Sequence, residues 1–158
     1  MFLKSKLFSL LILLALILVP IHISARTIGE VSTVFRAFAP NDKIVIESFS
    51  DPDVPQVICY LSRAKTGGLS GAVGVAEDGS DASVFCLKKG VISKVDNNIL
   101  SGKADGNHVF KKSTSLVFKT IQVVRFYDKE SHTLVYLAYS DKVLDGSPKN
   151  SVTAVSIN

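Results

Sequence analysis

The residues best suited to chemistry lie on both sides of a glycine-rich segment. Two cations, a threonine and two glycines precede it: Arg63, Lys65, Thr66, Gly67 and Gly68. Three carboxylates follow it: Glu77, Asp78 and Asp81. A guanidinium can hold an anion with two N–H groups, and successive glycine N–H groups can form a concave anion site. These residues therefore predict a site for an anionic small molecule or an acidic patch on a partner, against the alternative of a structural loop packed on a sheet.

Two short motifs around Lys65 resemble those of exported serine enzymes without forming their site. Ser62–Lys65 matches S-x-x-K, and Lys65–Gly67 matches K-T-G, as in penicillin-binding proteins and β-lactamases. Those enzymes place the two motifs far apart in sequence, whereas here both use the same lysine. The chain also lacks a G-x-S-x-G elbow and the glycine patterns of nucleotide-binding loops. We therefore predict no catalytic residue.

Metal-binding patterns are equally weak. Beyond residue 25, the only histidines are His108 and His132, which is too few for a typical zinc site. Glu77, Asp78, Ser80 and Asp81 offer oxygen ligands suited to calcium, but they lack the EF-hand spacing and are typical of a solvated turn. We predict neither a metal nor a cofactor.

The first 25 residues have the layout of a secretory signal peptide. Lys4 and Lys6 precede an apolar run from Leu7 to Val19, and Ala25 is a small residue at a plausible cleavage point. The run is shorter than the roughly 20 residues of a spanning helix. We therefore expect a cleaved leader over residues 1–25, with a retained membrane anchor as the alternative. A single exported domain over residues 26–158 would follow, with no membrane span.

The charge balance argues against a nucleic-acid partner. The leader contains two lysines and no acidic residue, so its removal lowers the formal net charge from +4 to +2. A nucleic-acid binder usually carries a strong basic stripe.

In an oxidising exported compartment, Cys59 and Cys86 would usually form a disulfide, whereas a redox pair would usually have C-x-x-C spacing. Two buried free thiols are the remaining alternative.

The pattern of β-branched and aromatic residues predicts a mainly β fold. Seven or eight short strands are expected, around residues 30–36, 44–49, 57–61, 82–87, 109–110, 116–127, 134–139 and 152–157. Such strands, separated by turn signals, indicate an antiparallel sandwich or a barrel-like sheet. Ile92, Val95 and Ile99 lie at helical spacing, which allows one short helix with Ser93 and Asp96 as a capping box and Gly102 at its end.

The longest β signal predicts an antiparallel hairpin over residues 116–139. A polar loop of about five residues separates its two runs. The residues expected to be buried in this hairpin are Phe118, Val124, Phe126, Leu137 and Tyr139.

Several long strings also resemble the CreA family of small exported bacterial proteins. They include the segment from Cys59 to Gly68, the segment from Gln122 to Asp128, and the segment from Leu137 to Val143. The resemblance covers nearly all of the chain beyond the leader and implies a Gram-negative periplasmic protein with Cys59 paired to Cys86. The family name points to catabolite regulation, but the resemblance carries no activity, cofactor or catalytic residue over to this chain.

Two functional hypotheses follow. The first is a non-enzymatic periplasmic binding or accessory module, linked to envelope or carbon-source signalling, with an envelope protein or an anionic small molecule as its partner. The second is a small periplasmic enzyme acting on an anionic metabolite or cell-wall fragment near Arg63 and Lys65. A pocket where these cations meet Asp78 or Asp81 would favour the enzyme, and a flat, partly apolar surface would favour a protein partner.

Overall fold

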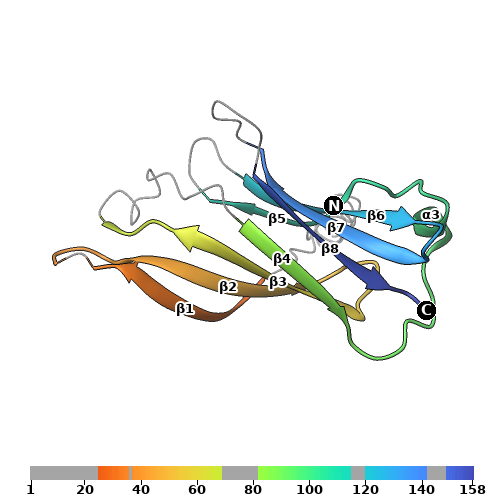
Figure 1. Cartoon of the computed structure of the whole chain (residues 1–158), viewed down its shortest axis with the longest axis horizontal. Coiled ribbons are helices and arrows are strands. Elements are labelled where there is room, and N and C mark those ends of the chain that lie inside the picture. Colours follow the sequence, from red (N-terminus) through yellow and green to blue (C-terminus); the bar gives the residue numbers. More distant parts are fainter. Residues whose placement is uncertain (1–24, 36, 69–81, 115–119, 142–148) are drawn as a thin grey trace, which may run out of the picture.

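A computed structural model describes residues 25–35, 37–68, 82–114, 120–141 and 149–158. Within these residues, eight strands form two antiparallel sheets of four strands each, and no closed barrel is present (Figure 1). The first sheet contains β1 (Arg26–Val34), β2 (Asp42–Ser50), β3 (Val57–Lys65) and β4 (Ala82–Lys88). The second contains β5 (Asn107–Ser113), β6 (Thr120–Asp128), β7 (Thr133–Ser140) and β8 (Asn150–Ser156). The predicted mainly β fold with seven or eight strands is confirmed.

Alternation along the strands buries one face of each sheet against the other. On β3, Cys59 and Leu61 are buried, whereas Tyr60 between them is half-buried on the opposite face. Phe49 of β2 stacks on Phe110 of β5 with ring centroids 4.5 Å apart, so the apolar core joins the two sheets directly. Removing this apolar surface from water is the main favourable contribution to folding.

Side chains of the second sheet close the junction between edge strands β4 and β8, which lie side by side (Figure 1). The Val84 N–H donates to Ser151 Oγ at 3.2 Å, and the Cys86 N–H donates to Thr153 Oγ1 at 3.3 Å. These hydroxyls give partners to edge-strand amides that would otherwise be open to pairing with another chain.

The two cysteines are joined as predicted. Cys59 of β3 and Cys86 of β4 are directly opposite each other in the strand register and form a disulfide. Both are buried in the core, so the bridge ties the two strands together on their inward face.

The predicted hairpin is confirmed, but the predicted burial of Phe126 is wrong. Strands β6 and β7 pair antiparallel, with Arg125 opposite Tyr136. Arg125 and Tyr136 face the core, which turns Phe126 outward and leaves it 38% exposed. The inward residues of β7 are Leu134, Tyr136 and Ala138, so Leu137 and Tyr139 are only half-buried. Val124 is buried as expected, and Phe118 lies outside the described residues.

The helix is shorter than expected and begins later. α3 spans Asn97–Leu100, and its N-cap is Asp96, whose carboxylate accepts the Asn98 N–H at 2.7 Å. The predicted start at Ser93 is therefore wrong, because Asp96 itself satisfies the first free amide of the helix. Gly102 follows the helix with φ 77, a backbone conformation that glycine adopts without strain.

Candidate functional site

A buried carboxylate joins the two sheets at the turn after β2. Asp51 is fully buried, and its oxygens Oδ1 and Oδ2 accept bonds from Arg125 Nη1 at 2.6 and 2.7 Å. Tyr136 donates its hydroxyl to Asp51 Oδ2 at 2.7 Å. Asp53, about half exposed, accepts from Arg125 Nη2 at 2.8 Å. We call Asp51, Asp53, Arg125 and Tyr136 the Asp51 cluster.

The turn itself holds the Asp51 carboxylate in place. Asp51 Oδ1 also accepts the backbone N–H groups of Asp53 at 2.9 Å and of Val54 at 3.2 Å. Burial lowers the pKa of Arg125, but the hydrogen bonds and charges of Asp51 and Asp53 outweigh it and raise that pKa. Burial, followed by the Asp51 charge, raises the pKa of the Tyr136 hydroxyl. Arg125 therefore stays charged and Tyr136 stays a hydrogen-bond donor, which makes the cluster a structural junction.

A second group of charged residues joins the two sheets within β2, four residues before Asp51. Glu47 is buried, and its Oε2 accepts from Arg63 Nε of β3 at 3.0 Å. Lys112 of β5, which is partly exposed, donates its Nζ to Glu47 Oε1. Burial raises the pKa of Glu47, but the hydrogen bonds and charges of Arg63 and Lys112 outweigh burial and hold that pKa below its ordinary value. We call these three residues the Glu47 cluster.

Of the predicted site residues that the structure describes, Arg63, Thr66, Gly67 and Gly68 have partners within the chain. Arg63 is buried against Glu47, whereas Lys65 at the end of β3 is exposed. Thr66 is half-buried and has an interaction of its own. Gly67 donates its N–H to Asp42 Oδ1, and Gly68 donates its N–H to Pro40 O, each at 2.7 Å.

The two glycines meet a geometric need at this contact. A Cβ at position 67 would lie 2.0 Å from Pro40 O, so only glycine fits there. Gly68 has φ 76, in the left-handed region that favours glycine. The predicted carboxylates Glu77, Asp78 and Asp81 lie outside the described residues, so their approach to Arg63 and Lys65 stays a prediction.

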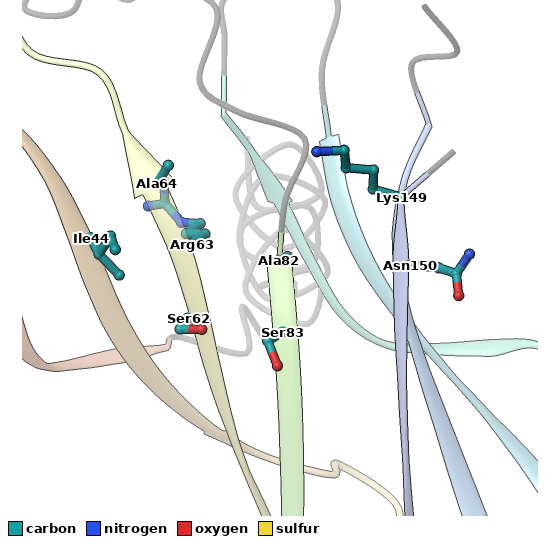
Figure 2. Close-up of a pocket in the computed structure, with 8 residues that line it drawn as sticks. All are labelled: Ile44, Ser62, Arg63, Ala64, Ala82, Ser83, Lys149 and Asn150. Carbon is teal, nitrogen blue, oxygen red and sulfur yellow. The ribbon is translucent and has the colours of Figure 1, made fainter. Parts of the chain in front are cut away.

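A pocket of about 520 Å³ lies where β3 ends and β4 and β8 begin (Figure 2). In Figure 2 the side chain of Lys149, the residue before β8, extends toward β4, whereas Asn150 points away. The residues that line the pocket are Ile44, Ser62, Arg63, Ala64, Ala82, Ser83, Lys149 and Asn150. Arg63, Lys149 and Asn150 have other interactions within the chain, so the pocket does not present uncommitted charges.

The two histidines that the structure describes, His108 and His132, belong to separate polar contacts. The His108 ring meets the Gln122 side chain, and His132 Nδ1 lies 3.0 Å from the Tyr127 hydroxyl. In the part of the chain that the structure describes, no three His, Cys, Asp or Glu side chains are grouped so as to hold a metal ion. No helix among those residues is long and apolar enough to cross a membrane.

Sequence reasoning missed both clusters, although each left a signal. Arg125 occupies an inward position within the apolar run of β6, and Glu47 occupies one within the apolar run of β2. A charge on the buried side of a strand needs a partner of opposite charge. That signal gives the need for a partner but not its identity, because Asp51 is 74 residues from Arg125.

Replacing Asp51 with alanine should destabilise the fold far more than replacing Asp53. Asp51→Ala leaves the Arg125 charge buried without its main partner, which costs about 3–5 kcal/mol of unfolding free energy. Asp53→Ala is the matched control, because this carboxylate is half exposed and its loss should cost about 1 kcal/mol or less. Urea unfolding of both variants measures the difference, and equal losses would show that burial of Asp51 is not what matters.

The Glu47 cluster predicts a loss of stability in acid. The pKa of Glu47 is lower in the folded chain than its ordinary value of 4.5, so folding favours the ionised form. The resulting stability is fully present above that ordinary value and is lost as the pH falls through the folded pKa. Glu47→Gln should therefore be less stable near neutral pH and lose less stability on acidification. Urea titrations across this range give the slopes, and parallel curves would contradict the prediction.

Comparisons with known proteins identify relatives over most of the chain. The family model described as CreA protein matches residues 28–158. The chain is 54% identical over 148 residues to Protein CreA of Escherichia coli strain K12, and the match covers 94% of each chain. Protein CreA of Escherichia coli O157:H7 matches with the same identity and coverage. No solved structure matches. The chain belongs to the CreA family.

Proposed function

We propose that the protein is an exported, non-enzymatic binding module that docks a protein of the cell envelope. The observation that carries this proposal is the outward side of the β1–β4 sheet. Apart from Asp42 at the start of β2, whose carboxylate accepts the Gly67 N–H, the outward-facing residues of β2, β3 and β4 are uncharged; they are Ile44, Ile46, Ser48, Ser50, Ile58, Tyr60, Ser62, Ala64, Ser83, Phe85 and Leu87. We call these residues the outer face.

The solvent-facing side of an antiparallel sheet usually carries polar and charged residues. Here Phe85 is 61% exposed, and Ile44, Ile46 and Leu87 are exposed as well. Val31 of β1 pairs with Ile44 and extends the apolar surface onto the edge strand. Depletion of charge together with exposed aromatic and aliphatic side chains is typical of the core of a protein–protein interface. The occupant should therefore present an apolar, uncharged patch of its own.

The alternative of an enzyme acting on an anionic substrate near Arg63 has less support. The guanidinium of Arg63 is already hydrogen-bonded to Glu47, and the Gly67 and Gly68 amides donate to Asp42 and Pro40. An anionic ligand would have to displace these contacts.

Export to the periplasm is part of the proposal. The apolar leader and its small residue at Ala25 support it. The Cys59–Cys86 disulfide supports it as well, because such bonds persist in oxidising compartments. The signalling role, in the envelope or in carbon-source use, belongs to the same proposal and rests on the family name.

Site-specific photo-crosslinking in the periplasm tests the docking surface. A photoreactive phenylalanine at position 85 should form a discrete adduct with another protein, identifiable by mass spectrometry. Position 152 is the matched control, because Val152 is 63% exposed but lies on the other sheet. Adding Ile46→Lys, which places a charge on the outer face, should abolish the adduct without lowering the melting temperature. Equal adducts from both positions, or an adduct that survives Ile46→Lys, would refute the proposal.

A further inference from the structure

The turn between β1 and β2 exposes two phenylalanine rings at an extremity of the molecule. Figure 1 shows this turn at one end of the longest axis, beyond the region where the two sheets pack together. Phe35 is 81% exposed and Phe38 is 100% exposed. Val31 and Val34, which lead into the turn, are also exposed. Large apolar side chains gathered at a projecting tip, away from the core, indicate a surface that meets another apolar phase.

The backbone that follows Phe38 is held in place by the two glycines after β3. Gly68 donates its N–H to Pro40 O, and Gly67 donates its N–H to Asp42 Oδ1. The missing side chain at Gly67 allows this approach, because a Cβ there would collide with Pro40 O. The side of the turn that leads into β2 is therefore braced, so less conformational freedom of that backbone would be lost when the rings enter a new environment.

Two lysines and two carboxylates lie at the base of the tip, and of these Lys65 is an exposed cation. The segment 31–41 contains one charged residue, Arg36, and no acidic one. Lys43 lies opposite Lys65 in the register of β2 and β3, so two further cations sit at the base of the hairpin. Lys43 also pairs with Glu30 at 2.6 Å, and the nearest acidic residue, Asp42, is engaged by the Gly67 amide.

We infer that this hairpin tip inserts Phe35 and Phe38 into the surface of a phospholipid bilayer that contains anionic lipids. Aromatic rings favour the interfacial region of a bilayer, and nearby cations are attracted to anionic headgroups. A bilayer accepts a convex tip without a complementary pocket. A protein partner would need a surface of about 800 Å² on each side, which two neighbouring rings do not supply. This surface adjoins the outer face at Val31, which pairs with Ile44, but the inference rests on Phe35 and Phe38, so either claim stands without the other.

The experiment uses the absence of tryptophan from the chain. Phe38→Trp, introduced into the chain from Arg26 onward, places a single fluorescent reporter at the tip. This chain contains every described strand, the helix and the disulfide. On addition of vesicles of phosphatidylethanolamine and phosphatidylglycerol, the emission of the variant should move to shorter wavelength. Phe85→Trp is the matched control, because Phe85 is exposed on the outer face, and its emission should not move.

Binding measurements give the second readout. In vesicle flotation, Phe35→Ser combined with Phe38→Ser should weaken binding by about tenfold or more, which corresponds to about 1.4 kcal/mol. Phe85→Ser should leave vesicle binding unchanged, and both variants should keep the melting temperature of the parent because the replaced rings are exposed. Vesicles of phosphatidylcholine alone should bind more weakly. An unchanged Phe38→Trp emission, an equal shift at Phe85→Trp, or equal binding to neutral vesicles would overturn the inference.

Discussion

The buried carboxylate of Asp51 fixes how the two sheets meet. It leaves the first sheet at the turn after β2 and accepts hydrogen bonds from Arg125 and Tyr136, which are opposite each other on β6 and β7 of the second sheet. A buried charge without a partner costs several kcal/mol, so a different placement of the sheets would be strongly disfavoured. The apolar core between the sheets stabilises the fold, but apolar burial is non-directional and does not specify how the sheets are placed. The Asp51 cluster and the Glu47 cluster favour one placement of the two sheets, because each pairs charges across them.

The same interaction explains which parts of the structure could be predicted from the sequence. Strand positions follow from local β propensity, and the disulfide follows from two cysteines in β-rich runs, so both could be predicted from the sequence. The family resemblance rested on long strings and was accessible as well. Which face of β6 points inward could not be predicted, because hydrophobicity alone predicts that Phe126 is buried. Arg125 takes that side only because Asp51, far away in sequence, compensates its charge. The start of α3 was misplaced because both Ser93 and Asp96 are acceptable N-caps. For the candidate site, the sequence singled out Arg63 and the two glycines but not their partners, since Glu47 and Pro40 reach them only through the fold.

The ion pairs within the fold limit which residues can bind another molecule. Arg63, Lys112 and Arg125 are each paired with a buried carboxylate. Of the two cations that the sequence singled out for anion binding, Arg63 is thus engaged within the fold, whereas Lys65 is exposed. Among the described residues, exposed apolar side chains gather on the outer face and at the two phenylalanines of the β1–β2 turn. The outer face lies on strands of the first sheet and the two phenylalanines lie in the turn between β1 and β2, so a protein partner and a lipid surface would contact different residues.

The account depends most on the coupling between Asp51 and Arg125 across the two sheets. A double-mutant cycle measures it directly, with the unfolding free energies of Asp51→Ala, Arg125→Met and the double variant compared with the parent. The account predicts that the double variant loses less stability than the two single losses combined, by about 1–3 kcal/mol, because the second change removes a charge that the first left unpaired. Losses that add to within about 0.5 kcal/mol would contradict it, since they would mean that the two residues act independently.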